Sequence, residues 1–284
     1  MTFTTLFIAC TVCANPAGDA MPASVSGDAR AIAMAAGVDT RVGGVSVGTD
    51  EGVTDLSERR IEGRFSVQPT ADVEVGIGMP VLFRTLQTSS AQWDDIVPGD
   101  LEVWTTGVVH RSGTSLRHDV TVTGQLKFPT APVTYNTSGD ALASNLQPGC
   151  SSIVPGVSGS YALAWSLVSL SFSGGLLLPI VVREAPHRGA MIRQTTTLRV
   201  RPVPALAFAA GFTWLGELIG QDETDANEED SGGLVGYASA AIEAGKPGLL
   251  VASVGLDAPA VKALRGEQSP TVIGMARLSV GWDI

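Results

Sequence analysis

The residues best suited to catalysis are three histidines, because an imidazole titrates near neutral pH and can take a proton from a serine hydroxyl. They are His110, His118 and His187. A serine hydrolase needs its serine and histidine within hydrogen-bond reach. The strands assigned below put His110 on the inner face of a sheet, His118 on the outer face and His187 in a connection. The histidines therefore cannot meet, and the sequence predicts a protein without catalytic activity.

Carboxylates that could hold a metal gather in one segment. Its spacing lacks the glycine and the terminal glutamate of a calcium-binding loop. We expect a solvated acidic loop with at most weak binding of divalent cations, and no cofactor. The residues of this loop are Asp222, Glu223, Asp225, Glu228, Glu229 and Asp230.

A third group of charged residues is scattered singly through otherwise apolar stretches. On the alternating pattern described next, these side chains all fall on one face, where they either line a passage or fill it with ion pairs. The sequence leaves both roles open. The candidates are Glu62, Arg64, Glu74, Asp100, Glu102, Arg117, Asp119, Lys127, Arg193, Arg199, Arg201, Glu243 and Arg277.

Strict alternation of apolar and polar residues is the main structural signal. From Val73 to Phe83 every second residue is apolar, and from Leu116 to Phe128 every position on one face is polar. This period of two is typical of strands with one face in lipid and one in water. Weaker examples cover 29–47, 61–67, 101–109, 153–165, 168–178, 192–200, 206–212, 234–242, 249–256 and 272–282. The first of these, 29–47, is rich in alanine and could instead be a helix inside the lumen.

The connections alternate between short and long, as in bacterial outer-membrane barrels. Short joins with turn-forming residues fall at 68–71, 112–115, 165–167, 201–204 and 245–248. Long joins fall at 39–53, 86–99, 129–150, 180–190, 220–231 and 257–270. The sequence therefore predicts a closed antiparallel up-and-down barrel of about 12 transmembrane β-strands, with short periplasmic turns, longer extracellular loops and both termini in the periplasm.

Composition agrees with this architecture. Only 16% of the 284 residues are charged, yet no apolar run reaches the roughly 20 residues of a spanning helix. The net charge of −10 argues against a nucleic-acid partner, since phosphate binding depends on basic clusters. Outer-membrane lipid, lipopolysaccharide and the barrel assembly machinery are the partners we expect.

The N-terminus resembles a secretory signal peptide without its basic residues. An apolar run from Leu6 to Ala14 precedes possible cleavage points after Ala14 and Ala20. We therefore expect an atypical leader at 1–20 and a single barrel domain at 21–284, the alternatives being a lipoprotein anchor and an ordinary N-terminus. Loss of the leader removes Cys10 and Cys13, so no disulfide framework is predicted.

The predicted turn at 112–115 also fixes a register. It places Asp100 opposite Lys127 and Glu102 opposite Gln125, so that opposite charges face each other on the lumen side. A soluble β-sandwich would also alternate, but it would not alternate short and long loops. A barrel with a structural or adhesin-like role, without transport, remains an alternative.

Three stretches resemble the outer-membrane proteins related to the phenol-degradation MetA pathway, a family of transporter-like barrels. They are GDLEVWTTGVVH from Gly99, LRHDVTVTGQLKFPTAP from Leu116, and LQPGCSSIVPGVSGSYAL from Leu146. The resemblance covers about a third of the chain, and Cys150 departs from it, where the family has a small residue. It implies a barrel of about twelve strands and a channel for small hydrophobic or aromatic solutes.

Overall fold

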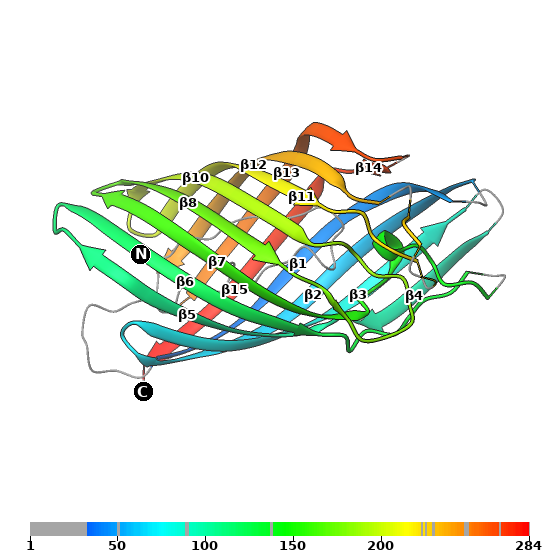
Figure 1. Ribbon diagram of the computed structural model, residues 1–284. Coiled ribbons are helices and arrows are strands. Elements are labelled where there is room, and N and C mark those ends of the chain that lie inside the picture. The colour runs from blue at the N-terminus through cyan, green and yellow to red at the C-terminus, as the bar shows by residue number, and fades with distance from the viewer. Residues whose placement is uncertain are drawn as a thin grey trace.

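Twelve strands form a closed antiparallel barrel in the computed structural model, which describes residues 33–49, 52–88, 91–136, 139–222, 224, 226–228, 231–246, 250–266 and 268–283. Each strand pairs with its neighbours in sequence, and β1 pairs with both β2 and β15, which closes the ring (Figure 1). The strands of the ring are β1 (Ala33–Thr49), β2 (Gly52–Thr70), β3 (Val73–Gln87), β5 (Leu101–Ser112), β6 (Leu116–Phe128), β7 (Ser152–Trp165), β8 (Val168–Leu177), β10 (Met191–Val203), β11 (Leu206–Glu217), β12 (Gly233–Lys246), β13 (Leu250–Leu264) and β15 (Ile273–Asp283).

Four small elements lie at one end of the ring. β4 (Gln92–Pro98) pairs with β3, β9 (Ile180–Val181) with β7, and β14 (Gln268–Pro270) with β1. The 3-10 helix η2 (Ser144–Leu146) lies in the connection between β6 and β7. We call this end of the barrel the long-loop end.

The other end, called here the short-turn end, carries tight connections such as Ala71–Asp72, Ser166–Leu167 and Pro204–Ala205. β1 begins and β15 ends there, since Ala33 pairs with Asp283 (Figure 1). The predicted barrel and its twelve strands are thus confirmed, and short and long connections alternate except between β1 and β2, whose connection is short. The predicted leader, residues 1–20, lies outside the described residues.

Two sequence expectations need correction. The segment 29–47 contains a strand, so the luminal helix is wrong for residues 33–47. The join predicted at 39–53 is not a loop, because β1 and β2 continue as a paired hairpin from Gly37–Arg64 to Thr49–Gly52. The same extension lengthens β3 and β13 beyond the predicted strands. Their polar residues were mistaken for loop, although a strand that projects past a membrane can be polar on its outer face.

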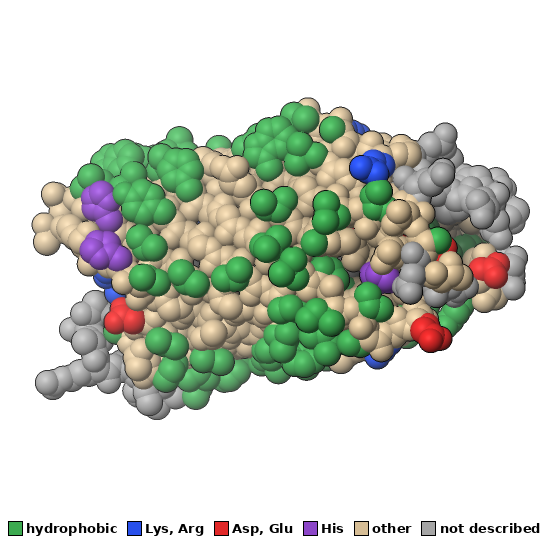
Figure 2. All heavy atoms as spheres, viewed as in Figure 1, with side chains coloured by type: hydrophobic (Ala, Val, Ile, Leu, Met, Phe, Trp, Pro, Cys, Tyr) green, Lys and Arg blue, Asp and Glu red, His purple; other side chains and the backbone are tan. Residues whose placement is uncertain are grey.

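The outer face of the barrel is apolar. Along β3 burial alternates at every residue, and the exposed positions include Val75 at 49%, Ile77 at 43% and Phe83 at 39%. Figure 2 shows hydrophobic side chains spread across the visible wall, with charged groups toward the two ends. A contiguous apolar surface of this extent is unfavourable in water and matches the hydrocarbon region of a bilayer.

Closure excludes the soluble sandwich, because a sandwich keeps two separate sheets with open edges. In a closed ring every strand has two partners, which satisfies the backbone polar groups that lipid cannot hydrogen-bond. Within the described ranges, no helix has the length and apolar character needed to cross a membrane.

Candidate functional site

The lumen has two unlike walls. One wall, called here the ion-pair wall, consists of the inner faces of β15, β1, β2, β3, β5 and β6, where long charged side chains bond to each other. The pairs are Asp39–Arg41 (3.3 Å), Asp39–Arg277 (2.7 Å), Glu62–Arg60 (2.6 Å), Glu62–Arg64 (2.7 Å), Glu58–Arg84 (3.4 Å) and Glu102–Lys127 (3.5 Å). Most of these side chains are almost fully buried, so they fill this side of the bore.

Trp104 packs into the same wall. Its ring lies against the backbone of Gly76, where an added Cβ would come within 2.2 Å of the ring, so only glycine fits there. The indole Nε1 donates to Glu74 over 3.4 Å, and the Arg64 guanidinium lies 5.4 Å from the ring centroid. The predicted luminal residue Glu74 is therefore held by a buried indole and does not face open solvent.

The predicted pairing of Asp100 with Lys127 is wrong by one step of the ladder. The hairpin turns later than predicted, with Ser112 opposite His118, and a bulge between Val108 and His110 then shifts the register by one residue, so that Glu102 lies opposite Lys127 and Trp104 opposite Gln125. Such an extra residue cannot be placed from the alternation alone, because either strand of the hairpin could carry it. The opposite charges still meet, but with Glu102 in the place given to Asp100.

The opposite wall, called here the small-residue wall, carries short side chains on β7, β8 and β10 to β13. Two predicted luminal arginines lie on it. Arg199 pairs with Glu243, and Arg193 is buried with its Nη2 3.4 Å from the Thr195 hydroxyl. Its small inner-face residues include Ser158, Ser160, Ser169, Ser171, Ser173, Thr195, Thr197, Ala209, Gly211, Ser239, Ala241 and Ser253.

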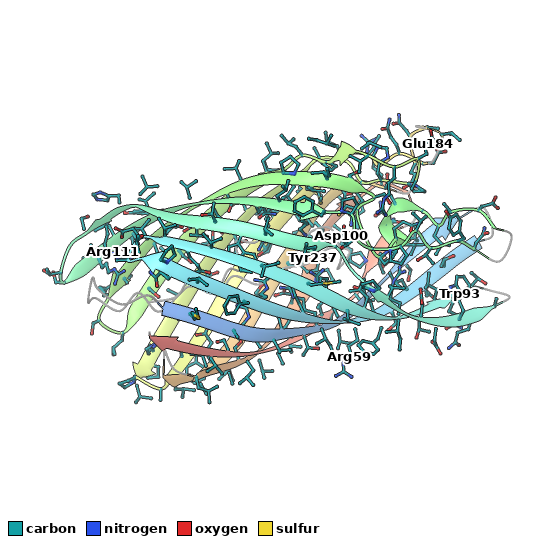
Figure 3. The ribbon with its side chains drawn as sticks, turned by 90° about the horizontal axis from the view of Figure 1, so that it is seen from below. Arg59, Trp93, Asp100, Arg111, Glu184 and Tyr237 are labelled. Atoms are coloured by element: carbon teal, nitrogen blue, oxygen red, sulfur yellow. The ribbon has the colours of Figure 1, made fainter. Side chains whose placement is uncertain are left out.

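Near the long-loop end the lumen is hydrophobic. Inward side chains from the ends of most strands touch one another and form one buried cluster, which we call the apolar layer. Tyr237 is completely buried in it, and Figure 3 shows this residue within the outline of the barrel. The members are Leu82, Val97, Cys150, Val154, Leu177, Met191, Leu215, Val235, Tyr237 and Ile273.

The sequence analysis did not anticipate this layer, although a signal was present. Val154, Leu177, Met191, Leu215 and Val235 each lie within three residues of the long-loop end of their strand and on its inner face. Both faces of these strands are therefore apolar at one end only. Two of these residues, Met191 and Leu215, lie outside the predicted strands 192–200 and 206–212, so the sequence analysis missed that these ends form an apolar layer inside the barrel.

The β6–β7 connection covers the mouth above the apolar layer. The carboxylate of Asp100 accepts the backbone N–H groups of Cys150 (2.7 Å) and Ala131 (3.2 Å), and its burial raises the pKa of Asp100. Arg84 donates to the carbonyl of Leu146, and the Gln147 amide bonds Thr134 and Leu142. Leu142 and Leu146 pack on Val45, Val47, Leu56 and Leu86. This connection is therefore anchored at several points.

The expectation for Cys150 also needs correction. This cysteine is disulfide-bonded, with its partner outside the described residues. The sequence analysis predicted that Cys150 has no disulfide partner, because removal of the leader also removes the other two cysteines.

The acidic loop contributes a second anchor. Glu228 accepts the backbone N–H of Ser144 (2.9 Å) and its hydroxyl (2.5 Å), and burial raises the pKa of Glu228. Asp222 instead accepts hydrogen bonds from Thr224 (2.7 and 2.8 Å) and the backbone N–H of Ala226 (2.9 Å), which lower the pKa of Asp222. The two carboxylates thus bind separate protein groups. Glu223, Asp225, Glu229 and Asp230 lie outside the described residues.

At the short-turn end Asp119 binds two arginines, Arg117 over 2.7 Å and Arg111 over 3.1 Å. Figure 3 shows Arg111 at this end of the barrel. Arg201, also predicted to be luminal, is only partly buried and donates weakly to the carbonyl of Pro204 (3.4 Å). These groups surround the opening at this end and do not pair with Lys127.

Two of the three histidines lie where the sequence predicted, and His110 does not. The bulge in β5 turns His110 to the outer face, where its Nε2 lies 3.0 Å from the Ser112 hydroxyl. His118 bonds Tyr161 over 2.8 Å on the same face, and His187 lies in a connection. Within the described chain no carboxylate bonds His110, so this serine–histidine contact lacks the orienting acid of a catalytic triad. Nor do three His, Cys, Asp or Glu side chains gather there to hold a metal.

Known structures share this fold. The COG4313 outer membrane channel from Pseudomonas putida F1 is 13% identical, aligns over 88% of this chain and 95% of that chain, and gives a TM-score of 0.68. Two others score lower. The β-domain of the Bordetella autotransporter BrkA has a TM-score of 0.49 at 10% identity, over 88% of this chain and 100% of that one. The translocator domain of NalP from Neisseria meningitidis has 0.48 at 8% identity, over 88% of each chain.

This chain has the fold of a bacterial outer-membrane β-barrel. At 13% identity the likeness to the Pseudomonas channel establishes the fold alone. No family model and no curated protein sequence matches the chain. The resemblance to the MetA-pathway family therefore remains a prediction.

Proposed function

We propose that this barrel is a narrow outer-membrane channel for small hydrophobic or aromatic solutes, with no catalytic step. The apolar layer is the observation that carries the proposal. A general porin has a polar, water-filled interior, whereas a ring of Leu, Val, Met, Ile and Tyr side chains excludes water and therefore ions. An apolar solute gives up no hydrogen bonds on entering such a layer, although the packed side chains must move apart to admit it.

The difference between the two walls indicates where a solute would pass through the lumen. Long ion-paired side chains occupy one side of the bore, and twelve strands enclose less space than the sixteen of an open porin. The remaining room lies along the small-residue wall, next to its serine, threonine and alanine side chains. The similar barrel from Pseudomonas putida is described as an outer membrane channel, which is consistent with this proposal.

We further propose that the long-loop end faces the cell exterior and that both termini lie in the periplasm. Exposed cations toward the long-loop end, namely Arg59, Lys262 and Arg265, would suit the phosphates of lipopolysaccharide. Figure 3 shows Arg59 projecting away from the wall. The barrel assembly machinery would insert the chain.

Uptake by intact cells tests the proposal. In a strain with complete lipopolysaccharide and no general porins, expression of the barrel should raise entry of radiolabelled ethylbenzene above that of cells with empty vector. Hydrolysis of nitrocefin by a periplasmic β-lactamase, a reporter of polar entry, should not change. Faster nitrocefin hydrolysis without faster ethylbenzene entry would contradict the proposal and indicate a polar pore.

A structural barrel without transport is the second candidate. The mouth cover favours it, because Asp100, Arg84, Gln147 and Glu228 anchor the β6–β7 connection across the entrance. Under this alternative neither ethylbenzene nor nitrocefin enters faster than in control cells. Loss of the barrel would instead weaken the outer membrane, measured as sensitivity to detergent.

A further inference from the structure

Asp257 is a buried acid that the ion-pair wall does not use. It lies on the inner face of β13 with 0% of its surface exposed, opposite Ser239 of β12. Among the described residues, neither carboxylate oxygen has a hydrogen-bond partner at normal distance. Its polar neighbours are the Ser239 hydroxyl and, at longer range, the guanidinium groups of Arg41 and Arg193. A buried carboxylate without close donors is unfavourable unless a further group supplies a hydrogen bond.

A small hollow lined by Ser239, the residue opposite Asp257, has the chemistry of a polar subsite. Its volume is about 20 Å³, enough for a group the size of one water molecule but too small for a ring. Ser239 connects it to Asp257, and Thr195, Thr197 and Ser253 add hydroxyl groups, with Glu243 at one side. These side chains offer donors and acceptors to a group that enters from the lumen.

The hollow lies directly beside the apolar layer. Tyr237, a member of that layer, is two residues from Ser239 on the same inner face of β12. Because Tyr237 is fully buried in the closed layer, a solute ring reaches it only when the layer opens, and the solute then extends one polar atom toward the hollow. The arginines near Asp257 offset its charge, so the position favours a neutral hydrogen-bond donor over a cation.

We propose that Asp257 and the hydroxyl-lined hollow bind the alcohol group of small aromatic solutes, while the apolar layer holds their rings. The inference rests on the proposed channel function and narrows its substrates to aromatic compounds that carry one neutral donor. The solute hydroxyl donates to the Asp257 carboxylate and accepts from the hydroxyls of the wall.

Two solutes of equal size test the inference, since benzyl alcohol and ethylbenzene differ only by a hydroxyl in place of a methyl group. Initial uptake of each is measured in the porin-deficient cells described above, with the empty-vector rate subtracted. In Asp257→Leu the ratio of benzyl alcohol to ethylbenzene uptake should fall about tenfold, the effect of one hydrogen bond to a charged acceptor. Ser160→Ala, a luminal hydroxyl outside the hollow, is the control and should leave the ratio unchanged.

A folded Asp257→Leu barrel with the wild-type ratio, or with both rates reduced equally, would overturn the inference. If this variant does not assemble, Ser239→Ala and Asp257→Asn replace it. Each should lower the ratio at least twofold, and an unchanged ratio in both would overturn the inference equally. Wild-type cells that take up neither solute above background would refute the channel itself, whereas uptake of ethylbenzene with no preference for benzyl alcohol would refute only the polar subsite.

Discussion

An arginine in the middle of β7 should reveal which face of the strand contacts lipid. Val157 is the sixth of the 14 residues of β7, faces outward and is 55% exposed. Full burial of a valine side chain contributes about 1.5–3 kcal/mol, so transfer of half of it into lipid contributes about 1 kcal/mol. An arginine at the midplane costs about 2–4 kcal/mol. Val157→Arg should therefore reduce the free energy of unfolding by about 3–5 kcal/mol, which is two to four orders of magnitude in the equilibrium.

Ser158→Arg is the matched control, because Ser158 lies at the same depth but faces the lumen beside the small-residue wall. Its guanidinium can stay hydrated, so we expect a loss below about 1 kcal/mol. Both variants would be refolded into lipid vesicles and titrated with urea, with the heat-dependent shift of the folded band on a gel as the readout. Equal losses in the two variants, or a larger loss for Ser158→Arg, would refute the assignment of the faces.

Three other predictions concern the ion pairs, the topology and the mouth. Lys127→Met should destabilise the barrel by about 3 kcal/mol in the same urea titration, since Glu102 then keeps a buried charge without its partner. Adding Glu102→Gln to this variant should restore most of the lost stability. If it restores none, the two residues are not coupled. A peptide tag after Asn136 should be labelled on intact cells and a tag after Thr114 only after permeabilisation, and the reverse pattern would invert the barrel. Because burial raises the pKa of Glu228, its contribution to stability is present at low pH and is lost as pH rises through that pKa. The mouth cover should therefore resist protease better at about pH 5 than at about pH 8, and Glu228→Gln should remove the difference; a variant that keeps it would assign the effect to another group.

The barrel could be predicted from the sequence because its signal is local. Strands such as 116–128 alternate so regularly that their bounds were predicted correctly, and the alternation of short and long joins ordered the remaining strands. The predicted strand bounds were wrong where a strand extends past the membrane and its outer face meets water instead of lipid. In β1 and β2 the hairpin past the membrane looked like loop, since its outer face is polar and its few inward apolar residues, such as Val45, Val47 and Leu56, are covered only by the distant β6–β7 connection.

The site was harder to predict because its contacts join strands far apart in sequence. A turn later than predicted and a one-residue bulge in β5 together bring Glu102 opposite Lys127, and the bulge turns His110 outward; the alternation reports neither. The apolar layer gathers single residues from most strands of the ring, so no window of sequence contains it. The anchoring of Ser144 by Glu228 links two loops 84 residues apart.

The ionic conductance of single barrels in planar bilayers tests the central claim, that the apolar layer closes the bore to ions. Wild-type protein should give currents far below those of a general porin, because a ring of apolar side chains excludes hydrated ions. Replacing two members, as Met191→Ser with Leu215→Ser, should raise the conductance several-fold, whereas Val157→Ser on the outer face should not. A wild-type barrel that conducts like an open porin, or a double variant that conducts no better than wild type, would contradict the account.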